Sequence, residues 1–298
     1  MLFDNNLFTV EKKLLSILLM TIGSVAISFN GLVLRNIETA DDWTIIFYRA
    51  LSFSITIFIY LFFIHKKRIF KKIIQIGISG LIGGFVLGIS NVCFILSMTT
   101  TSVANTVFTI SLIPFLTAFL SFLILKEKLA KITIFTMLLA FGGVLVMFYG
   151  VLLIGALWGN ILALFAAICF SIFTIILRMN KNIDMLPCLL MSGVIAIAFS
   201  SFQKMGSLQI SSNDFFLCFI LGAVLSGFVN CCFVFATRHL IAAEVTLFFF
   251  IEIALSPFWV WLFLNEYTTF NTLIGGIIIL ISILLRSIYL LLTKRKIN

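Results

Sequence analysis

The chain has 298 residues, of which 62% are apolar and 10% are charged, and its mean hydropathy is +1.24. Soluble globular domains do not have this composition, so the sequence predicts an integral membrane protein. The net charge of +9 does not indicate nucleic-acid binding, because the cations stand in short clusters between apolar runs, as in "HKKRIFKK" (65–72).

Apolar runs of about twenty residues, the length that crosses a bilayer, divide the chain into ten predicted helices. The sequence lacks the apolar/polar alternation of membrane barrels. The expected fold class is therefore an all-α membrane protein with ten transmembrane helices. In chain order, the expected spans are 14–34, 43–64, 73–98, 103–125, 131–151, 155–178, 185–203, 214–237, 242–264 and 270–292.

The distribution of Lys and Arg predicts the orientation of these helices. With a cytoplasmic N-terminus, all of the 20 Lys and Arg residues except Arg35, Arg49 and Lys204 fall on the cytoplasmic side or in the inner turn of a helix. The positive-inside rule then makes residues 1–13 and 293–298 cytoplasmic tails of a bacterial-type inner-membrane protein. Arg49 is expected close enough to the interface for its side chain to reach water.

An internal repeat relates the two halves of the chain, since residues 81–128 align with 220–267 without a gap. The identities include glycines and polar residues, which chance matches less easily than apolar letters: Gly83/Gly222, Gly88/Gly227, Asn91/Asn230 and Glu127/Glu266. Five spans per half is an odd number, so the second repeat, 155–292, crosses the membrane in the opposite sense to the first, 14–151. Such inverted-topology repeats are common in secondary transporters, whose substrate site lies near the midplane.

The fourth span of each half ends as "PFLTAFLSFLILKEKL" (114–129) or "SPFWVWLFLNE" (256–266). With "FYRA" in the second span and "GNILALFAAICFSIFTIILR" (159–178), these segments make the chain similar to the EamA branch of the drug/metabolite transporter superfamily. The resemblance implies ten helices around a central cavity lined mainly by spans 1, 3, 4, 6, 8 and 9. It also implies transport of amino acids, other metabolites or amphipathic compounds.

The most unusual residue is Glu252, which lies ten residues into the ninth span. At 1.5 Å per residue this is about 15 Å deep, near the bilayer centre. Acids at this depth are costly and usually functional, so we expect Glu252 to respond to a proton or to a cation on the substrate. The alternative is a protonated glutamate that is hydrogen-bonded to a neighbouring helix. In the repeat, Glu252 aligns with Ile113 and has no acidic counterpart.

Other polar or aromatic residues of the spans are further candidates for substrate binding. They are Asn230, Asn91, Ser256, Asn30, Ser28, Asn105 and Trp259. Amide side chains suit zwitterions or sugars, but they also bridge helices. Pro114 and Pro257 are expected to break their helices and to leave carbonyl groups free for a ligand, with a packing kink as the alternative. Glu127 and Glu266 stand at helix ends and are expected to satisfy backbone donors there.

The expected function is secondary transport of a small metabolite, such as an amino acid or a related amine-bearing compound, by alternating access. The expected partners are the lipid bilayer, the substrate and protons, with the chain as a monomer or a homodimer. No cofactor, metal site or catalytic residue is expected, and the sequence holds no G-x-x-x-x-G-K-[ST] motif for ATP. The alternative is a membrane-embedded enzyme acting on a lipid or isoprenoid, which would require clustered acids or histidines such as H-E-x-x-H, and the sequence has no such motif.

Overall fold

The computed structural model describes residues 2–101, 103–147, 149, 157–204, 208–264 and 270–295, and every regular element in these ranges is helical. The elements are α1 (Leu2–Ile27), α2 (Asn30–Arg35), α3 (Asp42–His65), the 3-10 helix η1 (Lys66–Arg68), α4 (Ile69–Gln75), α5 (Gly77–Thr100), α6 (Val103–Ile110), α7 (Ile113–Leu120), the π-helix η2 (Ser121–Leu125), α8 (Lys131–Met147), α9 (Leu157–Met179), α10 (Leu186–Gln203), α11 (Ser212–Phe219), the π-helix η3 (Ile220–Gly227), α12 (Phe228–His239), α13 (Ala242–Thr246), α14 (Phe249–Leu264) and α15 (Phe270–Arg295).

Eight helical segments of the described residues are long and apolar enough to cross a membrane. Two shorter apolar helices, Lys131–Met147 and Phe270–Arg286, lie where the sequence predicts the fifth and tenth spans. The prediction of an all-α membrane protein is therefore confirmed. Ten complete spans and inverted topology stay predictions.

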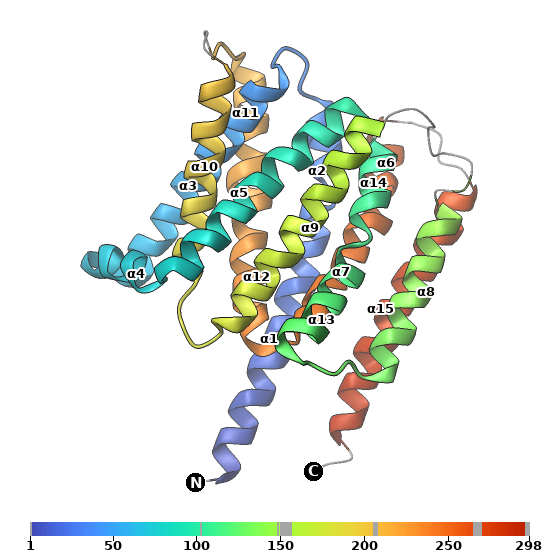
Figure 1. Ribbon diagram of the computed structural model, residues 1–298. Helices are drawn as coiled ribbons and strands as arrows, with labels where there is room; N and C mark the ends of the chain where they lie inside the picture. Colours follow the sequence, from blue (N-terminus) through green and yellow to red (C-terminus); the bar gives the residue numbers. More distant parts are fainter. Residues whose placement is uncertain are drawn as a thin grey trace.

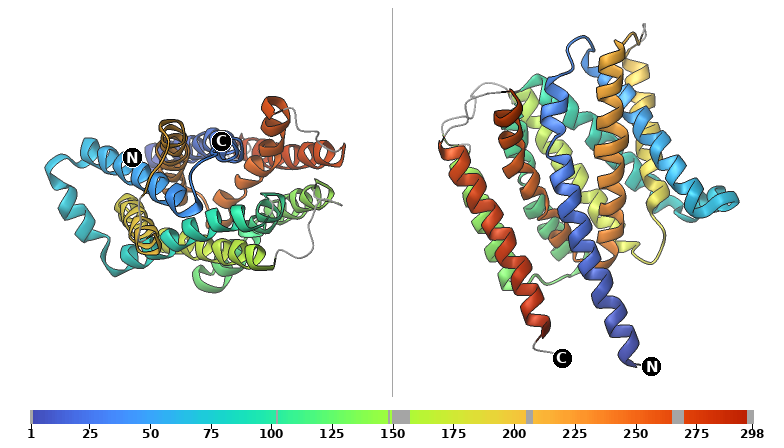
Figure 2. Two further views of the ribbon diagram at one scale, coloured as in Figure 1. Left: turned by 90° about the horizontal axis from the view of Figure 1, so that it is seen from above. Right: turned by 180° about the vertical axis from the view of Figure 1, so that it is seen from behind.

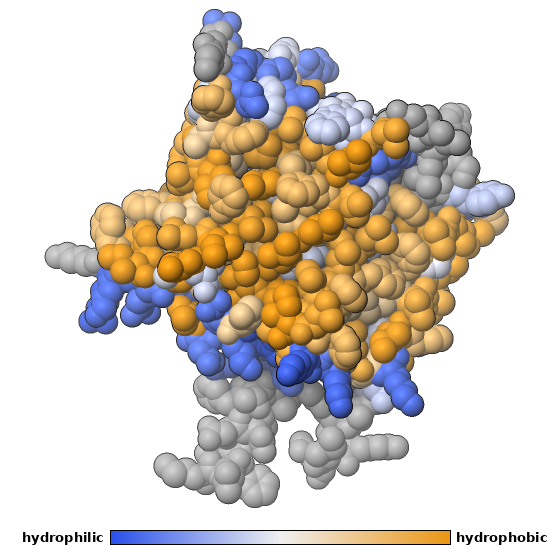
Figure 3. Space-filling model, viewed as in Figure 1, coloured by the Kyte–Doolittle hydropathy of each residue, from blue (hydrophilic) through white to orange (hydrophobic). Residues whose placement is uncertain are grey.

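The helices form a bundle in which α1 begins and α15 ends at the same end, called the terminal end below (Figure 1). The view from behind in Figure 2 shows the same arrangement. Within the bundle α5 packs along α9, α10 packs along α3 and α5, and α1 packs along α12. The surface carries a broad hydrophobic belt between hydrophilic rims, as contact with lipid requires (Figure 3).

Three spans are interrupted inside the bundle. The breaks fall at Ser28–Phe29, Ser111–Leu112 and Leu247–Phe248. Pro114 stands at the start of the helix after the second break, where a missing N–H costs little. The break predicted at Pro257 is wrong, because α14 continues through this position and the interruption lies ten residues earlier. Membrane helices tolerate a proline when the neighbouring structure satisfies the freed backbone groups.

The pair α8 and α15 lies side by side at one edge of the bundle (Figure 1). The two backbones approach most closely at Gly143 and Gly275. A Cβ atom on Gly143 would lie 2.8 Å from the carbonyl oxygen of Gly275 and 2.9 Å from the side chain of Ile279. Small residues allow this kind of close packing between membrane helices.

Replacing Gly143 should therefore weaken the α8–α15 contact. We expect Gly143→Leu to lower the free energy of unfolding by about 1–3 kcal/mol, because the added side chain has no space. The change would be measured as a lower melting temperature of the detergent-purified protein. Gly142→Leu is the matched control, since no described atom lies within 4 Å of a Cβ at position 142. Equal melting temperatures for the two variants would contradict the prediction.

Candidate functional site

A cavity in the interior of the bundle is lined by residues from both halves of the chain. It holds about 620 Å³ of space not filled by protein, counting its opening. Its polar lining consists of Asn30, Arg49, Ser90, Asn91, Ser226, Asn230 and Glu252. Its walls also carry the aromatic rings of Phe94, Phe170 and Phe249.

Four of the predicted substrate-binding residues meet at this cavity, namely Glu252, Asn91, Asn230 and Asn30. Asn91 and Asn230 are equivalent in the internal repeat, and the repeat equivalent of Glu252, Ile113, lines the cavity as well. Equivalent positions of the two halves thus converge on one site. Whether these residues contact a substrate stays a prediction.

The other four predicted residues do not line the cavity in this conformation. The indole Nε1 of Trp259 donates to Ser28 Oγ at 2.7 Å, and the Trp259 ring stacks on Phe29 with centroids 4.4 Å apart. Ser256 is buried and faces α2, where a Cβ on Gly31 would lie 3.1 Å from its Oγ. These residues join α14 to the α1–α2 segment.

Asn105 lies at a different pocket from Glu252. That pocket is lined by residues of α6 and α9 such as Phe108, Asn160 and Leu164, and none of the residues lining the central cavity contributes to it. The sequence pairs Asn105 with Glu244 in the repeat, but repeat equivalence alone does not bring both positions to the central cavity.

Arg49 of α3 is the charged cavity residue that sequence analysis missed. Its side chain is buried, its Nη2 donates to Ser226 Oγ at 2.9 Å, and its Nε has no hydrogen-bond partner among the described residues. The expectation that Arg49 reaches water at the interface is wrong, because position along a helix does not show which way a side chain points. The feature of the sequence that could have identified Arg49 is its departure from the positive-inside pattern.

The π-helix η3 positions the groups around Arg49. Ser226, at its end, accepts from Arg49 through its hydroxyl, and its carbonyl oxygen accepts from Nδ2 of Asn230 at 2.8 Å. A Cβ on Gly222 would clash with the carbonyl oxygen of Arg49, so the glycine lets α3 pass close to η3. Single π-helical turns often occur at functional sites because they shift side chains out of the regular helical register.

Glu252 and Arg49 line the same cavity without forming an ion pair. Glu252 makes neither an ion pair nor a hydrogen bond with any residue that the structure describes. Other charges in the bundle are paired, as Arg286 is with Glu244 at 2.7 Å. A charge buried without an opposite charge is costly. The cavity therefore offers one cationic and one anionic group to a molecule that enters it.

Aromatic side chains fill the bundle between the cavity and the terminal end. The centroid of Phe170 lies 5.1 Å from that of Phe233 and 5.2 Å from that of Phe249, while Phe233 and Phe249 stack at 5.6 Å. Phe173 lies one turn further along α9 and is fully buried, as is Phe233 within α12. Phe170 and Phe249 also line the cavity, so this aromatic layer borders it.

An ion-paired layer lies beyond the aromatic layer. Arg178 Nε pairs with Glu127 Oε1 at 2.7 Å, and Arg178 Nη1 donates to the carbonyl oxygens of Thr237 and Arg238 at 3.1 and 3.3 Å. Ser121 Oγ donates to the other carboxylate oxygen of Glu127. Glu127 thus holds a side chain of the second half, where sequence analysis expected it to satisfy backbone donors. Its repeat equivalent, Glu266, lies outside the described residues.

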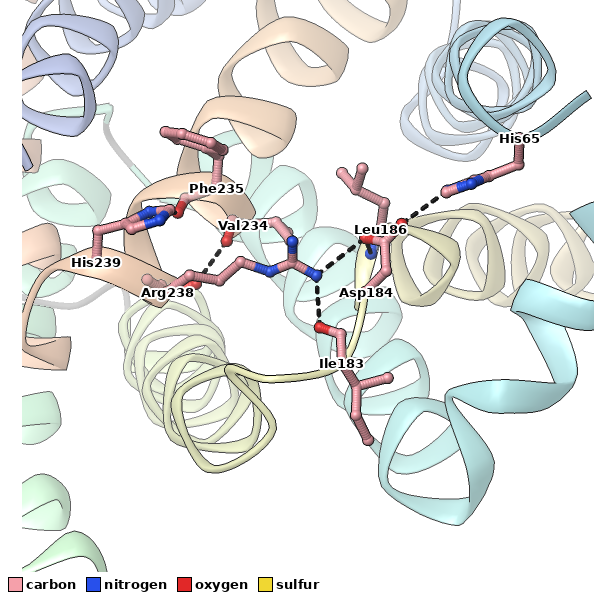
Figure 4. A network of polar contacts seen from close by, with 9 residues as sticks. His65, Ile183, Asp184, Leu186, Val234, Phe235, Arg238 and His239 are labelled. Carbon is pink, nitrogen blue, oxygen red and sulfur yellow. Dashed lines mark hydrogen bonds and ion pairs between the residues drawn. The ribbon is translucent and has the colours of Figure 1, made fainter. Parts of the chain in front are cut away.

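A third set of contacts joins three segments at the terminal end (Figure 4). Asp184, between α9 and α10, pairs with His65 Nε2 at 2.7 Å and with Arg238 Nη2 at 3.2 Å. The same Nη2 donates to the carbonyl oxygen of Ile183 at 2.5 Å. These bonds tie the ends of α3 and α12 to the α9–α10 connection.

The EamA-like transporter family matches the chain in two tandem segments, residues 14–149 and 157–288. A solved structure described only as "Crystal structure of protein" is similar with a TM-score of 0.72, covering 90% of this chain and 95% of that chain. At 14% sequence identity, this likeness shows the fold alone. No curated protein matches the chain. Because the family match covers most of the chain, the resemblance found in the sequence is confirmed, and the chain belongs to the EamA-like transporter family.

Proposed function

We propose that this protein is a secondary transporter of a small metabolite, an amino acid or a related amine-bearing compound, that works by alternating access around the central cavity. Glu252 is the group that responds to a proton or to the amine of the substrate. The observation that carries the proposal is the position of Glu252, which lines the cavity without an ion pair or hydrogen bond among the described residues. Unpaired intramembrane acids typically mark substrate or ion pathways.

The presence of Arg49 in the same cavity narrows the proposed substrate. A zwitterion has a carboxylate that can bind the guanidinium of Arg49 and an ammonium group that can bind Glu252. The amides of Asn91 and Asn230 can donate to and accept from the remaining polar atoms. Each charged group of the protein would then gain a direct ion pair, which Arg49 and Glu252 do not form with each other, and this favours a zwitterion over a simple amine.

The layers at the terminal end support alternating access. In the described conformation the aromatic layer and the Arg178–Glu127 pair lie along α9 between the cavity and the terminal end. Release to that side requires both layers to open. The pair crosses between the two halves of the chain, because Glu127 belongs to the first and Arg178 to the second. Movement of one half against the other would break it, as expected for transporters built from inverted repeats.

The proposal is tested by Glu252→Gln in proteoliposomes. The purified chain would be screened with labelled amino acids under an imposed pH gradient, and the variant assayed with the best substrate. We expect uptake to fall by about tenfold or more, because a charge-assisted hydrogen bond to the amine is lost. The pH dependence of uptake should disappear as well, since glutamine does not titrate.

Glu38→Gln serves as the control for this experiment, because Glu38 is an exposed acid in the α2–α3 connection. It should leave uptake and its pH dependence unchanged. Wild-type uptake together with wild-type pH dependence in Glu252→Gln would refute the role of Glu252.

The zwitterion prediction is tested by comparing an amino acid with its decarboxylated amine. Ligands that bind only the folded protein raise its melting temperature. Wild-type protein should bind the amino acid about tenfold or more tightly than the amine, because only the amino acid can bind Arg49 through a charge-assisted hydrogen bond. Arg49→Gln should abolish this preference without weakening amine binding, while Arg49→Lys should keep part of it. Equal binding of both compounds to the wild type would show that Arg49 does not select a carboxylate.

A further inference from the structure

The connection between α3 and α5 forms an elbow that projects from the side of the bundle (Figure 1). It comprises η1 and α4, residues Lys66–Gln75. The chain turns at each end of this elbow through positive φ angles, 49° at Lys66 and 58° at Gly77. Because it joins the ends of two candidate membrane spans, Asp42–His65 and Gly77–Thr100, the elbow lies at the level of a membrane surface.

The short helix α4 has three faces of different chemistry. At about 100° per residue, the side chains of α4 and of its flanking residues divide into an inward face (Ile69, Ile73, Ile76), an exposed apolar face (Phe70, Ile74) and a cationic face (Arg68, Lys71, Lys72). The inward face packs on the bundle, where Ile69 and Ile76 are buried. Phe70 and Ile74 are 77% and 78% exposed, which only lipid or a partner would stabilise. A helix with separate apolar and cationic faces suits the boundary between acyl chains and headgroups.

The cations of the elbow have no acidic partners within the described part of the chain. None of the ion pairs found there involves Lys66, Arg68, Lys71 or Lys72. The nearby acid Asp184 is already bound by His65 and Arg238. In Figure 3 the hydrophilic edge under the elbow continues the hydrophilic rim of the terminal end, with hydrophobic surface directly above it.

A groove runs between the elbow and the end of α3. Its walls include Phe62, Phe63 and Ile64, and its rim carries Lys66, Arg68 and Lys72. Phe63 is 75% exposed, so the apolar wall is open to the membrane. An apolar wall that ends in three cations matches a molecule with an acyl chain and an anionic headgroup. Zwitterionic lipids match less well, because their own ammonium group would lie among the cations.

We propose that this elbow is a binding site for anionic phospholipid, with the headgroup phosphate held by the cations of the groove rim and of the cationic face (Lys66, Arg68, Lys71 and Lys72) and an acyl chain along the groove wall at Phe63. Each cation near an anionic lipid surface raises the affinity of the site for anionic lipid by roughly fivefold. The site is independent of the substrate cavity, and its existence does not depend on the proposed transport function.

The test uses the full chain reconstituted in bilayers with equal amounts of phosphatidylglycerol and phosphatidylcholine. Spin-labelled phosphatidylglycerol or spin-labelled phosphatidylcholine is added, and the motionally restricted fraction of each is measured by electron paramagnetic resonance. Wild-type protein should restrict phosphatidylglycerol more strongly than phosphatidylcholine. The preference of the elbow site should fall by about fivefold or more in Arg68→Gln/Lys71→Gln/Lys72→Gln and should weaken at high salt.

Two further variants separate this site from general attraction to positive charge. Lys128→Gln/Lys131→Gln/Lys181→Gln removes three exposed cations from other connections at the terminal end and should keep the preference. Arg68→Lys/Lys71→Arg/Lys72→Arg keeps the charge of the elbow and should also keep it. Equal restriction of both lipids by the wild type would overturn the proposal. The proposal would also be overturned if the preference for phosphatidylglycerol survived in Arg68→Gln/Lys71→Gln/Lys72→Gln, or if Lys128→Gln/Lys131→Gln/Lys181→Gln lost it equally.

Discussion

The cost of an unpaired charge inside a membrane governs how this structure is organised. Arg178 is paired with Glu127 and Arg286 with Glu244, each at 2.7 Å. Glu252 and Arg49 depart from this pattern, since neither has an ion-pair partner among the described residues although both line the central cavity. Structural charges in the bundle are neutralised by each other. Under the proposed function, the substrate supplies the ion-pair partners of these two cavity residues.

The same cost applies to the backbone, and it explains where the helices are irregular. Each interruption adjoins a residue of the cavity: Asn30 follows the first break, Ile110 and Ile113 flank the second, and Phe249 follows the third. The π-helix η3 ends next to the cavity as well. In a bilayer, irregular backbone is tolerated only where protein or a water-filled cavity surrounds it. The position of the cavity therefore explains where the helices are interrupted.

Much of this architecture could be predicted from the sequence, because apolar length and the internal repeat are properties of the chain itself. Membrane depth and repeat equivalence selected Glu252, Asn91 and Asn230 as candidates, and all three line the central cavity. Arg49 was missed because depth along one helix says nothing about lateral burial. The break at Leu247–Phe248 could not be predicted from proline, since neither residue is one. Trp259 was predicted as a substrate-binding residue, but its bond to Ser28 depends on how two helices distant in the sequence pack.

The repeat also shows why the cavity can be specific. The two halves contribute equivalent amides to the cavity, since Asn91 is equivalent to Asn230. The acid is not repeated, because the position equivalent to Glu252 in the first half is the apolar Ile113. If the two repeats move against each other as proposed, they need similar packing on both sides, and the movement constrains the shared positions. Charge is needed only where the substrate carries the opposite charge. Under the proposed function, unmatched polar residues of the cavity are therefore where substrate recognition can change without disturbing the movement, and Glu252 is the clearest of them.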